Sequence, residues 1–341
     1  MRILFIGGTG IISMAITKLL SGKEGIELYL LNRGNRKDDV PKNVKIIQAD
    51  INNDDEKSIS EKLKDLFFDV VANFIAFVPE ELERDYRIFK NKTKQYIFIS
   101  SASAYQKPLS NYIITEGTTV SNPYWLYSRN KIACEEFLMK KYRDEKFPIT
   151  IVRPSHTYDE RSVPLGVHGK NGSWSVIKRM IEGKPVIIHG DGTSLWTMTH
   201  NSDFAKAFIG LLGNCHAIGE IFHITSDESL TWNQIYEAIA NALGVKLIAV
   251  HISSEFLNEV GKNYDFLGSL IGDKANSVVF DNSKLKRAVP GFVATKRFDE
   301  GIKETIEFIL KNKDLQKEDP EFDLFCDKVI SMREKAINEF K

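Results

Sequence analysis

Short runs of apolar residues alternate with stretches of helical spacing through the first half of the chain. Runs that are apolar at every position predict strands buried on both faces, as in a parallel sheet covered by helices. An alternation of such strands with helices is typical of a Rossmann-type doubly wound α/β fold. The expected strands are 3–6, 28–31, 44–47, 69–72, 95–99 and 150–152, and the expected helices are 11–20, 54–66, 80–91 and 123–142.

The alternation becomes irregular after Pro154, and 341 residues are many for a single hydrophobic core. A strand at 221–224 is expected to rejoin the sheet, and the charge-rich tail after Lys311 has the apolar spacing of an amphipathic helix. Further helices are expected at 174–181, 203–212, 232–243 and 300–310. We therefore expect a first domain at 1–155 with return segments near 195–225, and a smaller mixed lobe at 156–341 that includes the helical tail.

A glycine-rich turn lies between the first expected strand and the first expected helix. Glycines let the backbone turn tightly and approach a pyrophosphate, and the helix N-terminus then presents free N–H groups to that anion. The alternative is a turn that serves packing alone, but its place after a strand favours dinucleotide binding. The residues are Gly7, Gly8, Thr9, Gly10, Ile11 and Ile12, followed by Ser13 where a third glycine is usual.

The end of the second strand bears on the choice of dinucleotide. An NAD site usually has an acidic residue there, whereas this chain has Asn32 followed by Arg33, with Arg36 nearby. Guanidinium groups suit a 2′-phosphate, so NADP is favoured over NAD, unless both arginines are solvated loop residues. After the third strand come Asp50 and Ile51, and the carboxylate there is either an adenine ligand or a plain turn residue.

Tyr127 and Lys131 are four residues apart on an expected helix, and therefore lie on one face of it. An ammonium beside a phenol lowers the phenol pKa, which makes the tyrosine a usable general acid and base. The same spacing occurs at Tyr86 and Tyr142, so it is weak evidence by itself. Tyr127 is favoured because Ser101 ends the fifth strand, where ligands of open α/β sheets collect. The alternatives are a packing tyrosine and a capping serine.

Charge and cysteine content narrow the class of protein. The 46 acidic and 46 basic residues balance, which gives no indication of a nucleic-acid or membrane-surface partner. The longest apolar run, near residues 70–78, is about half of a membrane span. Three scattered cysteines fit a reducing, cytoplasmic location, and the seven histidines show no metal-ligand spacing.

In this order, the motifs make the chain resemble an extended, or atypical, short-chain dehydrogenase/reductase of the NAD-dependent epimerase/dehydratase family. The resemblance covers residues 1–310. It implies a nicotinamide cofactor, proton chemistry by Tyr127, Lys131 and Ser101, and hydride transfer on a sugar or sugar-nucleotide-like hydroxyl. It also implies that Pro154 and His156 border the nicotinamide, and that the Tyr127 helix builds a homodimer. The matching segments are 7–13, 50–51, 98–105, 127–131, 153–154, 189–192 and 200–205.

Departures from the family pattern concern the substrate, which the lobe at 156–341 is expected to bind. Ala102 and Ser103 replace the Asp-Glu pair of the sugar dehydratases, and Trp196 replaces an arginine that grips a diphosphate. We expect Ser103, Trp196 and His200 to contact the substrate. The complete set of expected cofactor-binding residues is Gly7, Gly8, Thr9, Gly10, Ile11, Ile12, Asn32, Arg33, Arg36, Asp50, Ile51, Phe74, Lys131, Pro154 and His156.

Two other functions use the same fold. The chain also resembles the chloroplast stem-loop-binding proteins, which bind RNA, but its zero net charge speaks weakly against a surface that binds the RNA backbone. The second alternative is a non-catalytic regulator that senses NADP. Such regulators often lack the catalytic tyrosine, so Tyr127 and Lys131 favour an enzyme.

Overall fold

The computed structural model describes residues 1–36 and 39–341. Its centre is a seven-stranded sheet with the order β12-β7-β5-β4-β1-β2-β3, and every neighbouring pair in it is parallel. The strands are β1 (Arg2–Ile6), β2 (Glu27–Asn32), β3 (Lys45–Gln48), β4 (Val70–Asn73), β5 (Tyr96–Ile99), β7 (Ile149–Pro154) and β12 (Ile221–Ile224). The doubly wound parallel sheet predicted from the apolar runs is therefore confirmed.

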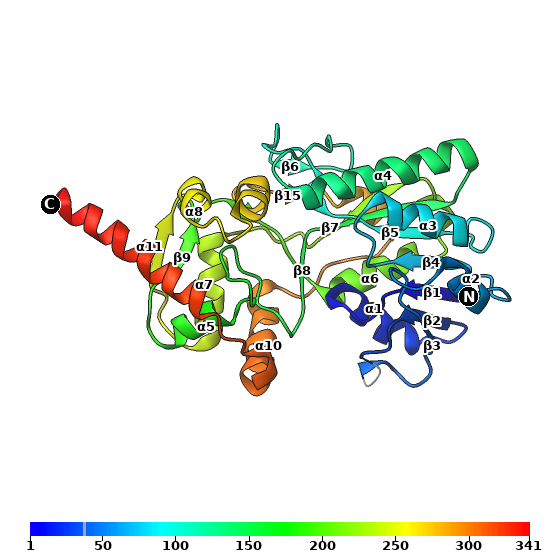
Figure 1. The fold of residues 1–341 in the computed structure, drawn as a ribbon, viewed down its shortest axis with the longest axis horizontal. Helices are drawn as coiled ribbons and strands as arrows, with labels where there is room; N and C mark the ends of the chain where they lie inside the picture. Colours follow the sequence, from blue (N-terminus) through cyan, green and yellow to red (C-terminus); the bar gives the residue numbers. More distant parts are fainter. Residues whose placement is uncertain (37–38) are drawn as a thin grey trace.

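Alternate side chains of the strands enter two separate hydrophobic layers. Ile3 and Phe5 pack in the layer that contains α1 and α6, whereas Leu4 and Ile6 face the layer that contains α2, α3 and α4. Helices cover both faces of the sheet (Figure 1), which is why its strands are apolar at every position. These helices are α1 (Ile11–Ser21), α2 (Glu56–Lys62), α3 (Pro79–Phe89), α4 (Leu126–Glu145) and α6 (Asn201–Leu211).

A second lobe has a hydrophobic core of its own and lies beside the carboxyl edge of the sheet (Figure 1). Its helices are α5 (Trp174–Ile181), α7 (Trp232–Leu243), α8 (Ser254–Val260), α10 (Phe298–Lys311) and α11 (Pro320–Glu339), with a π-helix at Leu267–Lys274; α9 (Ser283–Ala288) packs on β12 and α6. Short 3-10 turns lie at Ala102–Ala104, Cys215–Ala217 and Lys313–Leu315. The strand pairs are β9 (Val186–His189) with β14 (Ala249–Ile252), β8 (His156–Tyr158) with β11 (Met198–His200), β10 (Leu195–Trp196) with β13 (Leu230–Thr231), and β6 (Ile113–Ile114) with β15 (Val279–Phe280).

The predicted elements agree with the structure in kind and differ mainly at their ends. The predicted strand at 221–224 rejoins the sheet as β12, beside β7. The helix expected at 54–66 is shorter, because Asp55 caps it and it ends at Lys62. The short helices α8 and α9 and the π-helix had no periodic pattern long enough to reveal them. We retain the boundary between residues 155 and 156 as a proposal.

Candidate active site

The glycine turn connects β1 to α1 and has the backbone geometry that its sequence predicted. Gly7 and Gly8 have φ angles of 101° and 90°, which side chains rarely allow. A Cβ added at Gly8 would come within 2.6 Å of Leu30 Cδ2, and one at Gly7 within 3.0 Å of Ile75 Cγ2. The turn is therefore a close-packed backbone cradle at the N-terminus of α1.

Ser13, which replaces the third glycine of the motif, takes part in this turn. Its Oγ accepts a hydrogen bond from the Gly10 N–H at 2.9 Å. One turn further along α1, the Thr17 hydroxyl donates to the Gly8 carbonyl at 2.9 Å. Both bonds hold the turn against the helix, so serine at this position fixes the loop instead of disturbing it.

A groove of about 720 Å³ runs along the glycine turn and the carboxyl ends of β1, β2 and β3. Its size suits an extended ligand. Twelve of the fifteen expected cofactor-binding residues line it: Gly7, Gly8, Thr9, Gly10, Ile11, Ile12, Asn32, Arg33, Arg36, Asp50, Ile51 and Phe74.

The polar side chains at the β2 end of the groove are partly engaged with the protein. The Asn32 amide donates to the Gly7 carbonyl at 3.3 Å and accepts from the Gly34 N–H at 2.9 Å, so it braces the turn. Arg36 donates to the Thr9 carbonyl at 3.1 Å and is exposed. Hydrogen bonding from Asn53 lowers the pKa of Asp50, which keeps that carboxylate ionised.

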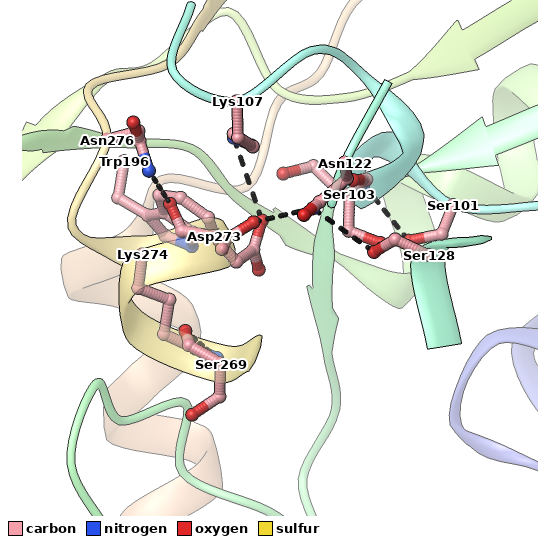
Figure 2. Close-up of polar contacts among 12 residues, drawn as sticks. Ser101, Ser103, Lys107, Asn122, Ser128, Trp196, Ser269, Asp273, Lys274 and Asn276 are labelled. Carbon is pink, nitrogen blue, oxygen red and sulfur yellow. Dashed lines mark hydrogen bonds and ion pairs between the residues drawn. The ribbon is translucent and has the colours of Figure 1, made fainter. Parts of the chain in front are cut away.

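A second, smaller cavity of about 290 Å³ lies between the sheet and the second lobe. Tyr127, Ser101 and Ser103 line it, as do Pro154, Ser155, His156 and Trp196, most of which the sequence singled out. Its other walls are Ala102, Lys107, Trp125, Asp273, Lys274, Val278 and Phe280. Figure 2 shows that its polar side chains come from segments far apart in the chain.

Tyr127 is at the start of α4, and Ser101 follows the end of β5. Burial raises the pKa of Tyr127 above its usual value, and a smaller effect of the Ser101 hydroxyl lowers it. The phenol is therefore protonated at neutral pH. The predicted lowering of this pKa by Lys131 does not appear, because burial and then the Asp273 carboxylate both raise the pKa of Tyr127.

Lys131 is buried in α4 and lines neither the groove nor the cavity. Its Nζ donates to the Ala76 carbonyl at 2.7 Å and to the Ile99 carbonyl at 2.8 Å. It is 5.8 Å from the centroid of the Tyr127 ring. Burial lowers its pKa to about 8, so the ammonium is retained at pH 7. The two carbonyls determine where the ammonium points, which no sequence motif could show.

The groove and the cavity meet at the end of β5. Ile99 lines the groove, and Ser101 lines the cavity. Phe77, another groove residue, has its ring centroid 6.1 Å from that of Tyr127. The Ser101 and Tyr127 side chains of the cavity thus lie close to residues that line the groove.

Hydroxyl groups continue from Ser101 into the protein. Ser101 Oγ is 2.9 Å from Ser103 Oγ, which accepts from the Ser128 hydroxyl at 2.8 Å (Figure 2). Asn122 donates to the Ser103 carbonyl at 2.8 Å and to the Gly272 carbonyl at 2.7 Å. It therefore ties the π-helix of the second lobe to the segment that follows β5.

His156 and Trp196 form the opposite part of the cavity wall. The Trp196 indole N–H donates to His156 Nδ1 at 3.3 Å. Burial lowers the pKa of His156 to about 3, so the ring is neutral and carries its proton on Nε2. The histidine is thus a fixed hydrogen-bond donor.

The structure does not bring His200 into the cavity, contrary to expectation. Its ring caps α6, where Nδ1 accepts from the Ser202 N–H at 3.3 Å, and packs edge-on against Tyr158. The family motif identified the position but not the direction of this side chain. Sequence reasoning also missed Lys107, Asp273 and Lys274, whose only signal in the sequence was their charge.

Residues 1–36 and 39–341 contain neither a candidate metal site nor a helix that could span a membrane. Within them, no cluster of three histidine, cysteine, aspartate or glutamate side chains has the arrangement of a metal site. None of their helices combines the length and the apolar character needed to cross a bilayer.

Comparison with known proteins gives consistent matches. The family model described as NAD dependent epimerase/dehydratase family matches residues 3–225. A 2'-dehydrokanamycin reductase from Streptomyces kanamyceticus is 23% identical over 294 residues, which are 86% of this chain and 80% of that protein. The chloroplast stem-loop binding protein of 41 kDa b from Arabidopsis thaliana is 27% identical over 256 residues, 71% of this chain and 63% of that protein.

Solved structures agree in fold. A UDP-glucuronic acid 4-epimerase from Bacillus cereus, in complex with NAD, superposes with a TM-score of 0.73 at 20% identity and covers 93% of this chain and 100% of its own. The same enzyme in complex with UDP-glucuronic acid and NAD gives a TM-score of 0.72 at 20% identity, over 91% of this chain and 99% of that one. Since the family model spans more than half of its 341 residues, the chain belongs to the NAD dependent epimerase/dehydratase family of enzymes.

Proposed function

We propose that this enzyme moves a hydride to or from a carbon that bears a sugar-like hydroxyl, as an oxidoreductase or a redox-neutral epimerase. The groove would hold a nicotinamide dinucleotide and the cavity would hold the substrate. One observation carries the proposal: Tyr127 and Ser101 line the cavity, and the nearby Phe77 and Ile99 line the groove. Without this proximity, Tyr127 and Ser101 would lie too far from a nicotinamide in the groove, and the family assignment alone would not support hydride transfer.

The groove residues fit a dinucleotide. Gly7 and Gly8 give the turn its positive φ angles and its close packing on Leu30 and Ile75. The α1 N-terminus then offers N–H groups and a positive dipole end to a pyrophosphate. Asp50 supplies an ionised acceptor for the adenine amine. When bound, the nicotinamide ring would accept or supply the hydride.

The chain's own groups would handle the proton. Tyr127, protonated at neutral pH, would donate its hydroxyl proton to the substrate oxygen during reduction and take it back during oxidation. Ser101 would hydrogen-bond that oxygen and keep its carbon facing the groove. The Lys131 ammonium, fixed by two carbonyls, would stabilise the phenolate once the proton has left.

Arg33 and Arg36 support NADP as the cofactor. Both line the groove beyond β2, where no acidic residue occupies the usual ribose-binding place at Asn32. Arg36 is anchored to the Thr9 carbonyl at 3.1 Å, close to the expected phosphate-binding turn. Arg33→Ala combined with Arg36→Ala should weaken NADP binding roughly ten- to a hundredfold and leave NAD binding within about threefold. Equal losses for both dinucleotides, measured by calorimetry, would contradict this choice.

Binding of RNA and a purely regulatory role are less favoured. The 2'-dehydrokanamycin reductase and the epimerase structures match more of their own length than the stem-loop binding protein does. A cavity with Tyr127 and Ser101 at its junction with the groove also has no purpose in RNA binding. A salt-titrated RNA shift assay is expected to show no specific complex.

We also propose a cytoplasmic location and a homodimer. The free cysteines Cys134, Cys215 and Cys326 are compatible with a reducing compartment. The outer surface of α4 exposes the apolar Leu126, and this helix is the expected dimer contact. Light scattering of the purified protein should give twice the mass of the chain.

The decisive experiment uses Tyr127→Phe. The protein is denatured to identify the dinucleotide it carries, and sugars and sugar nucleotides are then screened for a change in dinucleotide absorbance. Tyr127→Phe should lower kcat by about 10²- to 10⁴-fold, because a general acid–base is lost, while dinucleotide binding stays unchanged. Tyr142→Phe is the matched control, since it is on the same helix and also precedes a lysine by four residues. Retained turnover in Tyr127→Phe would refute the proposal.

A further inference from the structure

Two oppositely charged side chains meet in the cavity wall outside every recognised motif. Lys107 follows the 3-10 turn after β5, and Asp273 belongs to the π-helix of the second lobe. Both line the cavity that contains Tyr127, and Figure 2 shows them directed toward each other. Their side chains are only 1% and 14% exposed. Neither residue transfers a proton in the proposed reaction, although the Asp273 carboxylate raises the pKa of Tyr127.

The pair is incompletely satisfied by the protein. Lys107 Nζ is 3.8 Å from Asp273 Oδ1, which is longer than a hydrogen bond. Within the described part of the chain, neither charged group makes a closer side-chain hydrogen bond. An ammonium has three donors and a carboxylate accepts several bonds, and buried groups of this kind require partners. The unused donors and acceptors therefore face the cavity.

We infer that Lys107 and Asp273 select the substrate by binding two neighbouring hydroxyls of an uncharged, polyhydroxylated ring. The ammonium donates to one hydroxyl oxygen, and the carboxylate accepts the proton of the next. A hydroxyl both donates and accepts, so a pair of them matches the separation and the opposite character of the two groups. The inference rests on the proposed function, because the ring is the substrate of the same cavity.

The remaining walls suit such a ring. A cavity of about 290 Å³ is at the lower limit for small-molecule sites and corresponds to one ring, not to a large ligand. Trp196 contributes an aromatic surface, which packs on the C–H face of a sugar. His156 adds a neutral N–H donor, because its Nδ1 accepts from Trp196. Aromatic surface and convergent donors and acceptors together describe a polyol site.

The charges nearby argue against a charged ring. Lys274 donates to the Ser269 carbonyl at 3.3 Å, and the carboxylates of Asp273 and Asp265 act on its ammonium. Together with Lys107, the wall and its surroundings hold two ammonium and two carboxylate groups. An acidic ring would bring a second negative charge to Asp273, and an amino ring a second positive charge to Lys107. Either is unfavourable where the groups are buried.

The test compares matched probes on the purified, dinucleotide-loaded protein. Quenching of tryptophan fluorescence reports binding of D-glucose, D-glucuronate, D-glucosamine and UDP-glucose, with the galactose series in parallel. Neutral hexoses should bind at least tenfold more tightly than the acid or the amine. Lys107→Met and Asp273→Asn should each weaken binding of the neutral hexose roughly ten- to a hundredfold without changing dinucleotide affinity. Lys170→Met, which breaks a surface ion pair of 3.6 Å, is the control.

Several outcomes would overturn the inference. Preferred binding of glucuronate, lost in Lys107→Met but retained in Asp273→Asn, would indicate an acid site. Preferred binding of UDP-glucose with unchanged affinity in both variants would place recognition elsewhere, and so would binding of none of the probes. The double variant, which removes both charges of the pair together, covers the case in which a single variant fails to fold. Failure of the proposed function is distinguishable, because it would appear as unchanged turnover in Tyr127→Phe whatever the probes do.

Discussion

The groove beside the glycine turn and the cavity beside Tyr127 are built in different ways. The walls of the groove come from four short segments within residues 7–77 and from Ile99, each at the end of a strand. The cavity takes its walls from 101–107, 125–127, 154–156, Trp196 and 273–280. The groove is largely a backbone structure that the local sequence specifies. The cavity is a set of side chains that only the tertiary fold brings together. This difference determines how the groove and the cavity respond to mutation.

The largest effect on binding is expected from a single methyl group added in the groove. Gly8→Ala forces a side chain onto a residue with φ of 90° and places its Cβ 2.6 Å from Leu30 Cδ2. The strained turn or the buried Leu30 side chain must shift, which should cost about 1–3 kcal/mol of unfolding free energy and weaken dinucleotide binding at least a hundredfold, to be measured by calorimetry. Substrate probes in the cavity should bind as before.

Gly25→Ala is the matched control for the groove. Gly25 also has a positive φ, 73°, but no atom lies within 4 Å of the added Cβ. The Gly25→Ala variant should lose stability through backbone strain and keep its dinucleotide affinity. Equal affinity in both variants would mean that the close approach at Gly8 does not form the dinucleotide site.

The same contrast explains what the sequence could and could not predict. The glycine turn, the parallel strands and the choice of Tyr127 over Tyr142 follow from local spacing and from the rule that ligands collect at strand ends. The proposed roles of Lys107 and Asp273 depend on a contact between residues that are far apart in the chain, and one sequence does not show such a contact. The side-chain direction of His200 could not be predicted either, because a motif fixes a position, whereas the cap of α6 directs this ring away from the cavity lining.

Acid should affect the lobe that holds the cavity more than it affects the groove. His189, which is 1% exposed, lies in β9 with Nε2 against the Lys274 carbonyl at 3.1 Å, while Nδ1 has no hydrogen-bond partner among the described residues. Burial lowers its pKa from 6.5 to about 4. The unfolded chain therefore binds this proton first, and stability falls as the pH drops from 6.5 towards 4.

Removing His189 should flatten that pH dependence. The depressed pKa corresponds to roughly 3 kcal/mol of unfolding free energy lost between pH 6.5 and pH 4. In His189→Gln that part of the loss should disappear, as measured by urea unfolding at a series of pH values. His216→Gln, at an exposed position, should leave the slope unchanged. An unaltered slope in His189→Gln would show that this ring takes up its proton without unfolding.

The smallest effect tests a single hydrogen bond within the cavity. Trp196→Phe keeps an aromatic ring but removes the indole N–H that donates to His156 Nδ1 at 3.3 Å. His156 is then free to adopt either tautomer, and its Nε2–H is no longer a fixed donor to the substrate. A neutral hydrogen bond is worth about 1 kcal/mol, so kcat/KM should fall about three- to tenfold with unchanged dinucleotide affinity. Trp174→Phe, outside the cavity lining, should have no such effect. If Trp196→Phe instead weakened dinucleotide binding, the groove and the cavity would be energetically coupled, and their separate construction would not extend to function.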